Sequence, residues 1–318
     1  MTCQPTLPFT PEMHATLREW GPRWHEDIVA GRDAMYAAWA PLLAAAPPVA
    51  GRVEQDVAYG ADPRQVLDIN VPDDVKDAPV LVFVHGGAFV RGDKQATPHM
   101  YGNVLAEFAR HGFVAVNVEY RLATQQPWPS GAEDVRDAVL WVSQHIASRG
   151  GDPRRIFLAG HSAGCAHCAT AVWDDVVRPP QGLPLVGLAL LSPRVAADVR
   201  PENPNAHGVR AYYGRDETLY ARRGPISHVR PDAPPTFIAV AHYENPLLEF
   251  QAFELAHRLA LLADAQGGPM PRLVQYTDHN HVSVVAQFNT PHNKLGADLR
   301  DWFSRVLHGE FAARRKTF

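Results

Sequence analysis

The residues Gly160-His-Ser-Ala-Gly164 place one serine, Ser162, between two glycines. The apolar run Arg155–Ala159 precedes them, and a helical pattern from Ala163 to about Val177 follows. A serine in a tight turn between a strand and a helix is exposed as a nucleophile, and small neighbours relieve the crowding in that turn. The helix N-terminus adds unpaired amide donors and a positive dipole end. The pattern therefore indicates a nucleophilic serine, the simpler alternative being a chance match.

A second pattern, His85-Gly-Gly-Ala-Phe89, follows the apolar run Val80–Val84. Small residues at the end of a strand allow backbone N–H groups to converge on an oxygen that gains negative charge during acyl transfer. A pair of glycines alone could equally form a simple turn. The position ahead of the serine motif favours an oxyanion-binding loop.

A serine hydroxyl needs a base to take its proton, and the usual chain order is serine, acid, histidine. Of the 16 histidines, only His279 and His281 lie just after the predicted last strand, Arg272–Tyr276. Both are candidate bases, and either could instead be a solvated loop residue. They also form a His-x-His pair, but only Asp278 stands nearby as a further ligand, so we expect no metal.

The acid should follow the preceding strand, Thr236–Ala241, and Glu244 stands three residues beyond it. Glu249 is an alternative, although it falls within a helical pattern and could lie on a solvated face. Asp198, after the strand before, is a second alternative. Cys165 and Cys168 form a Cys-x-x-Cys pair, which we interpret as packing within a buried helix, because Ser162 takes the helix start that a redox cysteine would need.

Short apolar runs alternate with helical patterns along most of the chain, which predicts an α/β fold with a mostly parallel sheet and helices on both of its faces. Two segments with a period of two, Arg52–Tyr59 and Gln65–Val71, predict an antiparallel hairpin before it. Further strands are expected at Phe113–Val118 and Leu185–Leu191. Further helices are expected near Pro98–Arg110, Gly131–Ser148, Leu247–Asp264 and Lys294–Leu307.

Three regions organise the chain. Residues 1–50 are predicted to form an N-terminal helical arm or cap that ends at Pro47-Pro48. Residues 51–318 are predicted to form one catalytic domain. Residues 198–235 are rich in proline and polar side chains, which is typical of a lid or a functional insertion.

The composition excludes several classes of protein. The chain has 318 residues, 46% of them apolar, and a formal charge of -4. It lacks the basic stripe of a nucleic-acid binder. Three cysteines cannot build a disulfide framework, which favours a reducing cytosol. Met1 to Thr10 has no apolar signal core, and prolines break the stretch from Tyr36 to Ala50, so we expect a soluble cytoplasmic protein without a membrane span.

From about Val66 to Phe303 the chain resembles the alpha/beta-hydrolase superfamily. Within it the chain is most similar to the carboxylesterases of the hormone-sensitive-lipase-like and related bacterial groups. The resemblance rests on His85–Phe89, Glu119-Tyr-Arg-Leu-Ala123, Gly160–Gly164, Glu244-Asn-Pro-Leu247 and His281-Val-Ser283. The chain departs from that group at Ala88, where a third glycine is usual, at Thr124-Gln125, where Pro-Glu is frequent, and at His161, where aspartate is more frequent.

The resemblance implies roles for individual residues. The oxyanion donors would be the N–H groups of Gly87, Ala88 and Ala163. His281 would be the base, since His-Val-Ser is similar to the family's His-Phe-Ser, and Glu244 would be the acid, where the family more often has aspartate. An N-terminal segment caps the site in the hormone-sensitive-lipase-like group. Here Trp20, Trp24, Tyr36 and Trp39 could roof the acyl pocket or simply anchor the arm.

We therefore expect the alpha/beta-hydrolase fold and a serine hydrolase that cleaves carboxylic esters of small or medium size through an acyl-enzyme. No metal or organic cofactor is needed for that reaction. The alternatives are an amidase of the kynurenine-formamidase type and a non-catalytic ligand receptor on the same fold. The expected partner is a small-molecule ester, with neither nucleic acid nor membrane, and a homodimer is allowed.

Overall fold

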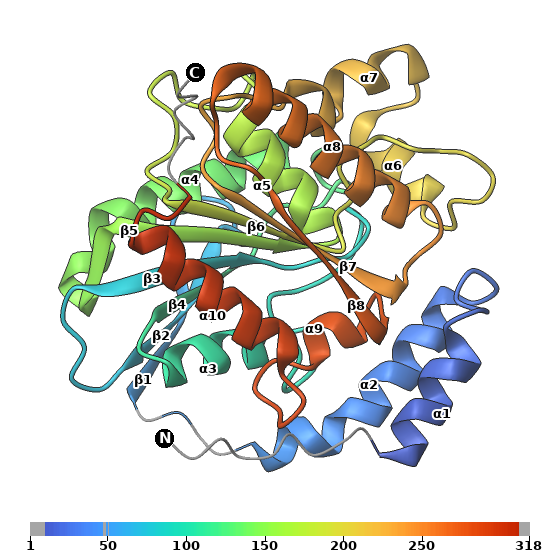
Figure 1. Ribbon diagram of the computed structural model, residues 1–318, viewed down its shortest axis with the longest axis horizontal. Helices are drawn as coiled ribbons and strands as arrows, with labels where there is room; N and C mark the ends of the chain where they lie inside the picture. The colour runs from blue at the N-terminus through green and yellow to red at the C-terminus, as the bar shows by residue number, and fades with distance from the viewer. Residues whose placement is uncertain (1–9, 47–48, 50, 312–318) are drawn as a thin grey trace.

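The computed structural model describes residues 10–46, 49 and 51–311, which are built around an eight-stranded sheet (Figure 1). Its strand order is β1-β2-β4-β3-β5-β6-β7-β8. The strand β2 runs antiparallel to both of its neighbours, and the remaining neighbours are parallel. The strands are β1 (Gly51–Ala58), β2 (Val66–Pro72), β3 (Ala78–Val84), β4 (Val114–Val118), β5 (Gly151–His161), β6 (Gly187–Leu191), β7 (Thr236–Tyr243) and β8 (Arg272–Asn280).

Helices cover both faces of the sheet (Figure 1). On one face α4 (Ser130–His145), α5 (Ala163–Trp173) and α8 (Leu248–Gln266) contribute to one apolar cluster. On the other face α3 (Gly102–Arg110), α9 (Ser283–Ala286) and α10 (Lys294–Leu307) contribute to a second. The central strands are buried from both sides, which explains why their sequences are continuously apolar. The predicted α/β fold with helices on both faces is confirmed.

The predicted hairpin is also confirmed, as β1 and β2, while the ends of several other elements differ from prediction. The last strand, β8, continues beyond Tyr276 to Asn280, so His279 lies on this strand and His281 directly follows it. The helix after Ser162 ends at Trp173, earlier than predicted. Residues 198–235 contain α6 (Ala206–Tyr213), α7 (Tyr220–Arg223) and short 3₁₀ turns.

Two N-terminal helices, α1 (Pro11–Trp20) and α2 (Ile28–Ala45), begin at side-chain caps. The hydroxyl of Thr10 accepts a hydrogen bond from the Met13 amide, and Asp27 accepts one from Ala30. Figure 1 shows both helices beside α9 and the end of β8. Their buried side chains join the cluster of that face. The predicted boundary at Pro47-Pro48 and the residues before Thr10 lie outside the described ranges.

The chain order reverses at β3, which has β4 on one side and β5 on the other. In open parallel sheets a crevice forms at such a reversal, outside the carboxyl ends of the strands. The segments that leave β3, β5, β7 and β8 all start from this edge. The predicted nucleophile, oxyanion loop, acid and base belong to these segments, so the topology can bring them together.

Candidate active site

Ser162 lies in a strained turn between β5 and α5. Its φ is 54° and its ψ is -119°, a conformation that non-glycine residues rarely adopt. A Cβ atom added to Gly160 would lie 2.8 Å from the carbonyl carbon of Gly164, and one added to Gly164 would lie 2.4 Å from the carbonyl oxygen of Val84. Both glycines are therefore required on steric grounds, as the sequence pattern indicates.

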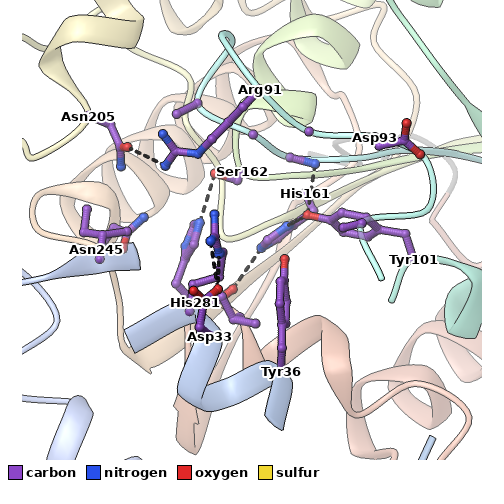
Figure 2. A pocket seen from close by; sticks show the side chains of 18 of the residues that line it. Asp33, Tyr36, Arg91, Asp93, Tyr101, His161, Ser162, Asn205, Asn245 and His281 are labelled. Atoms are coloured by element: carbon purple, nitrogen blue, oxygen red, sulfur yellow. Dashed lines mark hydrogen bonds and ion pairs between the residues drawn. The ribbon is translucent and has the colours of Figure 1, made fainter. Parts of the chain in front are cut away.

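The structure brings Ser162, His281 and Glu244 together in one hydrogen-bonded row (Figure 2 shows the first two). The serine Oγ lies 2.9 Å from His281 Nε2, and His281 Nδ1 lies 2.7 Å from Glu244 Oε2. These partners assign the proton to Nδ1, which donates to the carboxylate, and leave Nε2 to accept from the hydroxyl. At most 9% of each residue is exposed. This arrangement can transfer a proton from the hydroxyl to the imidazole.

The carboxylate of Glu244 is held by more than the imidazole. Its Oε1 accepts a hydrogen bond of 3.0 Å from the Ala241 amide at the end of β7. Burial alone would raise the pKa of Glu244, but the nearby charge and hydrogen bond of His281, together with the Ala241 amide, keep this pKa below its ordinary value. The group is therefore ionised at neutral pH, where it can orient the imidazole and stabilise its charged form.

The loop after β3 has an unusual backbone. Gly87, Ala88 and Phe89 have φ values of 149°, 51° and 70°. Gly87 and Ala88 line the same pocket as Ser162, and Ala163 opens the helix immediately after it. In the described part of the chain, the N–H groups of Gly87, Ala88 and Ala163 donate to no other residue. These three amides are thus available to an oxyanion.

Packing fixes this loop from above. The ring of Phe89 stacks on that of Tyr212 in α6, with centroids 4.6 Å apart. Gly208, also in α6, approaches so closely that an added Cβ would lie 2.1 Å from the carbonyl oxygen of Ala88. The segment 198–235 therefore braces the loop that carries the free amides.

A second chain of hydrogen bonds, absent from the sequence predictions, runs behind the serine. The Gly86 amide donates to the hydroxyl of Tyr101 over 3.2 Å, and this hydroxyl lies 3.0 Å from His161 Nδ1. His161 Nε2 lies 2.9 Å from the carbonyl oxygen of His281. Since a carbonyl only accepts, Nε2 carries the proton, and the Tyr101 hydroxyl donates to Nδ1.

Burial, followed by the nearby His281, lowers the pKa of His161 well below its ordinary value, so its ring stays neutral. Burial raises the pKa of Tyr101, so the hydroxyl keeps its proton. The hydrogen-bond directions are therefore stable near neutral pH. They tie the loop after β3, the turn at Ser162 and the residues after β8 to one another.

The alternative site residues lie elsewhere. His279 Nδ1 lies 3.2 Å from Ser283 Oγ, and its ring stacks on Trp39. Asp198 forms an ion pair with Arg200, and Glu249 lies in the first turn of α8. His281 and Glu244 are thus the residues that the structure places in line with Ser162.

Other predicted features have structural explanations. Cys165 and Cys168 are buried free thiols, and Cys165 Sγ lies 3.0 Å from the Gly160 carbonyl oxygen, which agrees with packing roles. In the described ranges no group of three or more His, Cys, Asp or Glu side chains is arranged to hold a metal ion. Across these same residues, no helix has both the length and the apolar character needed to cross a membrane.

A pocket of about 470 Å³ opens above Ser162 (Figure 2). One wall comes from the N-terminal segment and contains Trp24, Ile28, Arg32, Asp33 and Tyr36. The opposite parts include Arg91, Asn205 and Asn245, none of which the sequence motifs single out. Asn245 follows Glu244 directly, but no local pattern marks Arg91 or Asn205 as pocket residues.

The sheet, its crossover at β3 and the serine turn after β5 define the alpha/beta-hydrolase fold. Comparison with known proteins gives the same result. The BD-FAE family model matches residues 67–172. A solved esterase from Pyrobaculum calidifontis superposes with a TM-score of 0.71 at 24% identity, covering 96% of this chain and 100% of that one.

Curated relatives place the chain among esterase-like sequences. It is 28% identical to Esterase LipQ of Mycobacterium tuberculosis over 282 residues, which are 82% of this chain and 64% of LipQ. It is 37% identical to Carboxylesterase NlhH of the same species over 152 residues, 46% of this chain and 44% of NlhH. The chain thus spans less than two thirds of these relatives. The expected resemblance to alpha/beta-hydrolase carboxylesterases of the hormone-sensitive-lipase-like type is confirmed.

Proposed function

We propose that the protein is a serine hydrolase that cleaves carboxylic esters of small or medium size. Ser162 is the nucleophile, His281 the general base and Glu244 the residue that orients and stabilises the imidazole. The observation that carries this proposal is the row of two short hydrogen bonds, 2.9 Å and 2.7 Å long, that joins these residues beside the pocket. The geometry matches that of a Ser-His-acid triad.

The reaction proceeds in two acyl transfers. Ser162 Oγ attacks the ester carbonyl carbon while His281 Nε2 takes the hydroxyl proton, and the carbonyl oxygen becomes an oxyanion. The amides of Gly87, Ala88 and Ala163 donate to this oxyanion. As the intermediate collapses, the imidazolium gives its proton to the departing alcohol and an acyl-enzyme remains. Water then attacks the acyl group by the same proton transfers and releases the acid.

The pocket and the relatives support the substrate class. A volume of about 470 Å³ lies within the range of small-molecule sites. The relatives LipQ and NlhH are named an esterase and a carboxylesterase. A non-catalytic receptor has no need of the complete hydrogen-bonded row, and no feature of the pocket favours an amidase.

Replacing the nucleophile gives the direct test. Ser162→Ala should lower kcat/KM for 4-nitrophenyl acetate and butyrate by about 10⁴-fold or more, because the covalent step is lost. It should also abolish labelling by a fluorophosphonate probe. Ser304→Ala, which changes an exposed serine of α10, is the matched control and should retain both properties.

The outcomes separate the alternatives. If the wild-type protein hydrolyses an N-formyl anilide in preference to the aryl esters, the protein is an amidase and the esterase proposal is wrong. Labelling and turnover that both survive Ser162→Ala would remove this residue from the mechanism. If the wild-type protein is not labelled by the fluorophosphonate probe and hydrolyses none of the esters, the result supports the non-catalytic receptor.

We also propose that the N-terminal segment, residues 1–50, caps the catalytic domain of residues 51–318. Its support is the pocket wall formed by Trp24, Ile28 and Tyr36. Residues 198–235 are proposed as an insertion that completes the opposite side, since Asn205 lines the pocket and α6 braces the oxyanion loop. A cytoplasmic location and a homodimer remain proposals from the sequence, to be tested by cell fractionation and sedimentation.

A further inference from the structure

The side chain of Arg91 lies in the pocket wall and has no carboxylate partner among residues 10–46, 49 and 51–311. Arg91 belongs to the loop after β3, where its amide donates to the Gly87 carbonyl over 3.1 Å. It is half-buried and lines the same pocket as Ser162. Figure 2 shows its side chain directed toward Asn205. The contact there, 3.4 Å from Arg91 Nη2 to Asn205 Oδ1, is long and involves a neutral group.

The other charged groups of the pocket do not compensate this guanidinium. Arg32 forms an ion pair of 2.8 Å with Asp33. Asp93 is exposed, and its carboxylate accepts the Gln95 amide over 2.7 Å. Figure 2 shows the side chains of Asp93 and Arg91 directed away from each other. Within the described residues, Arg91 takes part in no ion pair, whereas Arg32 is paired with Asp33.

The surroundings of Arg91 favour an incoming anion. Burial, followed by the charge of Arg32, lowers the pKa of Arg91, although an arginine remains charged at neutral pH. Burial raises the pKa of the nearby Tyr36, so its hydroxyl keeps its proton. In the described part of the chain this hydroxyl has no hydrogen-bond partner, and Tyr36 also lines the pocket. A guanidinium and a free hydroxyl donor thus face the same space.

We propose that Arg91 binds a carboxylate of the substrate, so that the preferred substrates are esters that carry a free carboxylate group. This proposal rests on the proposed esterase function and specifies its substrate class. A guanidinium offers two parallel N–H groups that match the two oxygens of a carboxylate. Arg91 stands four residues after Gly87, so the same short loop would hold the carboxylate and the oxyanion of one substrate.

The carboxylate can belong to the acyl part or to the alcohol part of the ester, and two substrate pairs distinguish these sources. The acyl pair is 4-nitrophenyl hydrogen adipate and its neutral methyl ester. The alcohol pair is 4-acetoxybenzoate and 4-acetoxybenzamide. In at least one pair, we expect the wild-type kcat/KM to favour the charged ester by about tenfold or more, the range for hydrogen bonds to charged groups.

Arg91→Met and Arg91→Gln should abolish this preference, measured as the ratio of kcat/KM for the charged ester to kcat/KM for the neutral ester of the same pair, since only the charged ester makes the ionic contact. Arg222→Met removes one exposed arginine and is the charge-matched control, which should keep the preference. Circular dichroism and the melting temperature of each variant establish folding. The second substitution keeps hydrogen-bond donors in place if the first one unfolds the loop.

Two results would overturn the assignment to Arg91. In one, the wild-type protein hydrolyses the neutral esters in a Ser162-dependent way but shows no preference in either pair. In the other, the preference survives both Arg91 substitutions. A failure of the esterase function itself looks different, because neither neutral ester would then be hydrolysed by the wild-type protein.

Discussion

Tyr101 connects the two halves of the site through a single hydroxyl. It accepts from the Gly86 amide and donates to His161, whose other nitrogen donates to the His281 carbonyl. The residue is buried, so removing its hydroxyl would leave buried polar groups without a partner. Among the described residues, Tyr101 makes no hydrogen bond to Ser162, His281 or Glu244, and we regard it as a positioning residue.

Tyr101→Phe should therefore lower kcat about tenfold with little change in KM, because the oxyanion loop and the His281 loop lose their common support. Two buried polar groups would also lose a partner, at a cost of about 1–3 kcal/mol each in the free energy of unfolding. Steady-state kinetics and urea unfolding measure the two effects.

Tyr276→Phe is the matched control, because it also removes the hydroxyl of a buried tyrosine. That hydroxyl donates a hydrogen bond of 2.8 Å to Asp298 and lies outside the proposed site. It should reduce stability without a selective loss of kcat. Equal losses of kcat in both variants would show that Tyr101 acts only through stability.

Residues with a local steric requirement, and an acid and a base that follow predicted strands in the expected chain order, could be predicted from the sequence. Supporting residues that no motif or chain order marks could not. Gly160 and Gly164 lie within two positions of the serine whose turn requires them. Tyr101 and His161 are joined by a hydrogen bond although they are 60 positions apart in the sequence. Neither the position of Tyr101 before α3 nor that of Arg91 in a loop carries a pattern that marks it as part of the site.

The helix α6 acts on the site through a contact that only glycine permits. Gly208 lies against the Ala88 carbonyl, at a distance where a methyl group would overlap it. The Ala88 amide, one of the free donors, precedes this carbonyl in the chain and is joined to it through the Ala88 Cα, so displacement of the carbonyl would also reorient the donor. The insertion 198–235 thus has a mechanical connection to the loop after β3.

Gly208→Ala should lower kcat/KM for neutral esters by about tenfold or more, the effect expected when one oxyanion donor is displaced. Gly102→Ala is the control, because Gly102 begins α3 and has no atom within 4 Å of an added Cβ. This control should keep full activity and gain up to about 1 kcal/mol in stability. Full activity of Gly208→Ala would contradict the bracing role of α6.

Strands with both faces covered by helices could be predicted well from the sequence, whereas the ends of strands at the edge of the sheet could not. The strand β3 is buried along nearly its whole length and has a continuous apolar sequence. The edge strand β8 alternates exposed and half-buried residues and ends in the polar residues His279 and Asn280. The apolar pattern therefore predicts an end at Tyr276, which is too early. Backbone pairing with β7, and not apolar character, extends β8 to Asn280.

At the scale of the whole molecule, buried neutral histidines make stability depend on pH. Burial lowers the pKa of His85 to about 4, that of His167 to about 3 and that of His279 to about 4. In the unfolded chain a histidine takes up its proton near pH 6.5. Between these values the unfolded state binds more protons than the folded state, so folding becomes less favourable as the pH falls.

Between about pH 7 and pH 8 the free energy of unfolding should thus vary little, and it should fall between about pH 6.5 and pH 4, with each buried histidine contributing up to about 1.4 kcal/mol per pH unit. Glu244, whose pKa is lowered, adds a loss in the same direction only below about pH 4.3. Urea unfolding at a series of pH values measures the slope.

His167→Phe should reduce this slope, because it removes one buried titrating group. His308→Gln removes an exposed histidine and should leave the slope unchanged. A free energy of unfolding that is flat between pH 6.5 and pH 4 would contradict the neutral state of these rings.

The proposed catalytic residues and the residues of the pocket walls come from different parts of the fold, which has a consequence for how substrate preference can change. The residues proposed to act in catalysis stand at the ends of strands, whereas the pocket walls that would meet the rest of the proposed substrate come from the connecting segments and the N-terminal helices. Exchanges in those peripheral pieces can redirect the choice of compound while the bond-breaking step stays intact. Related sequences could therefore differ in substrate preference while keeping the same proposed catalytic residues.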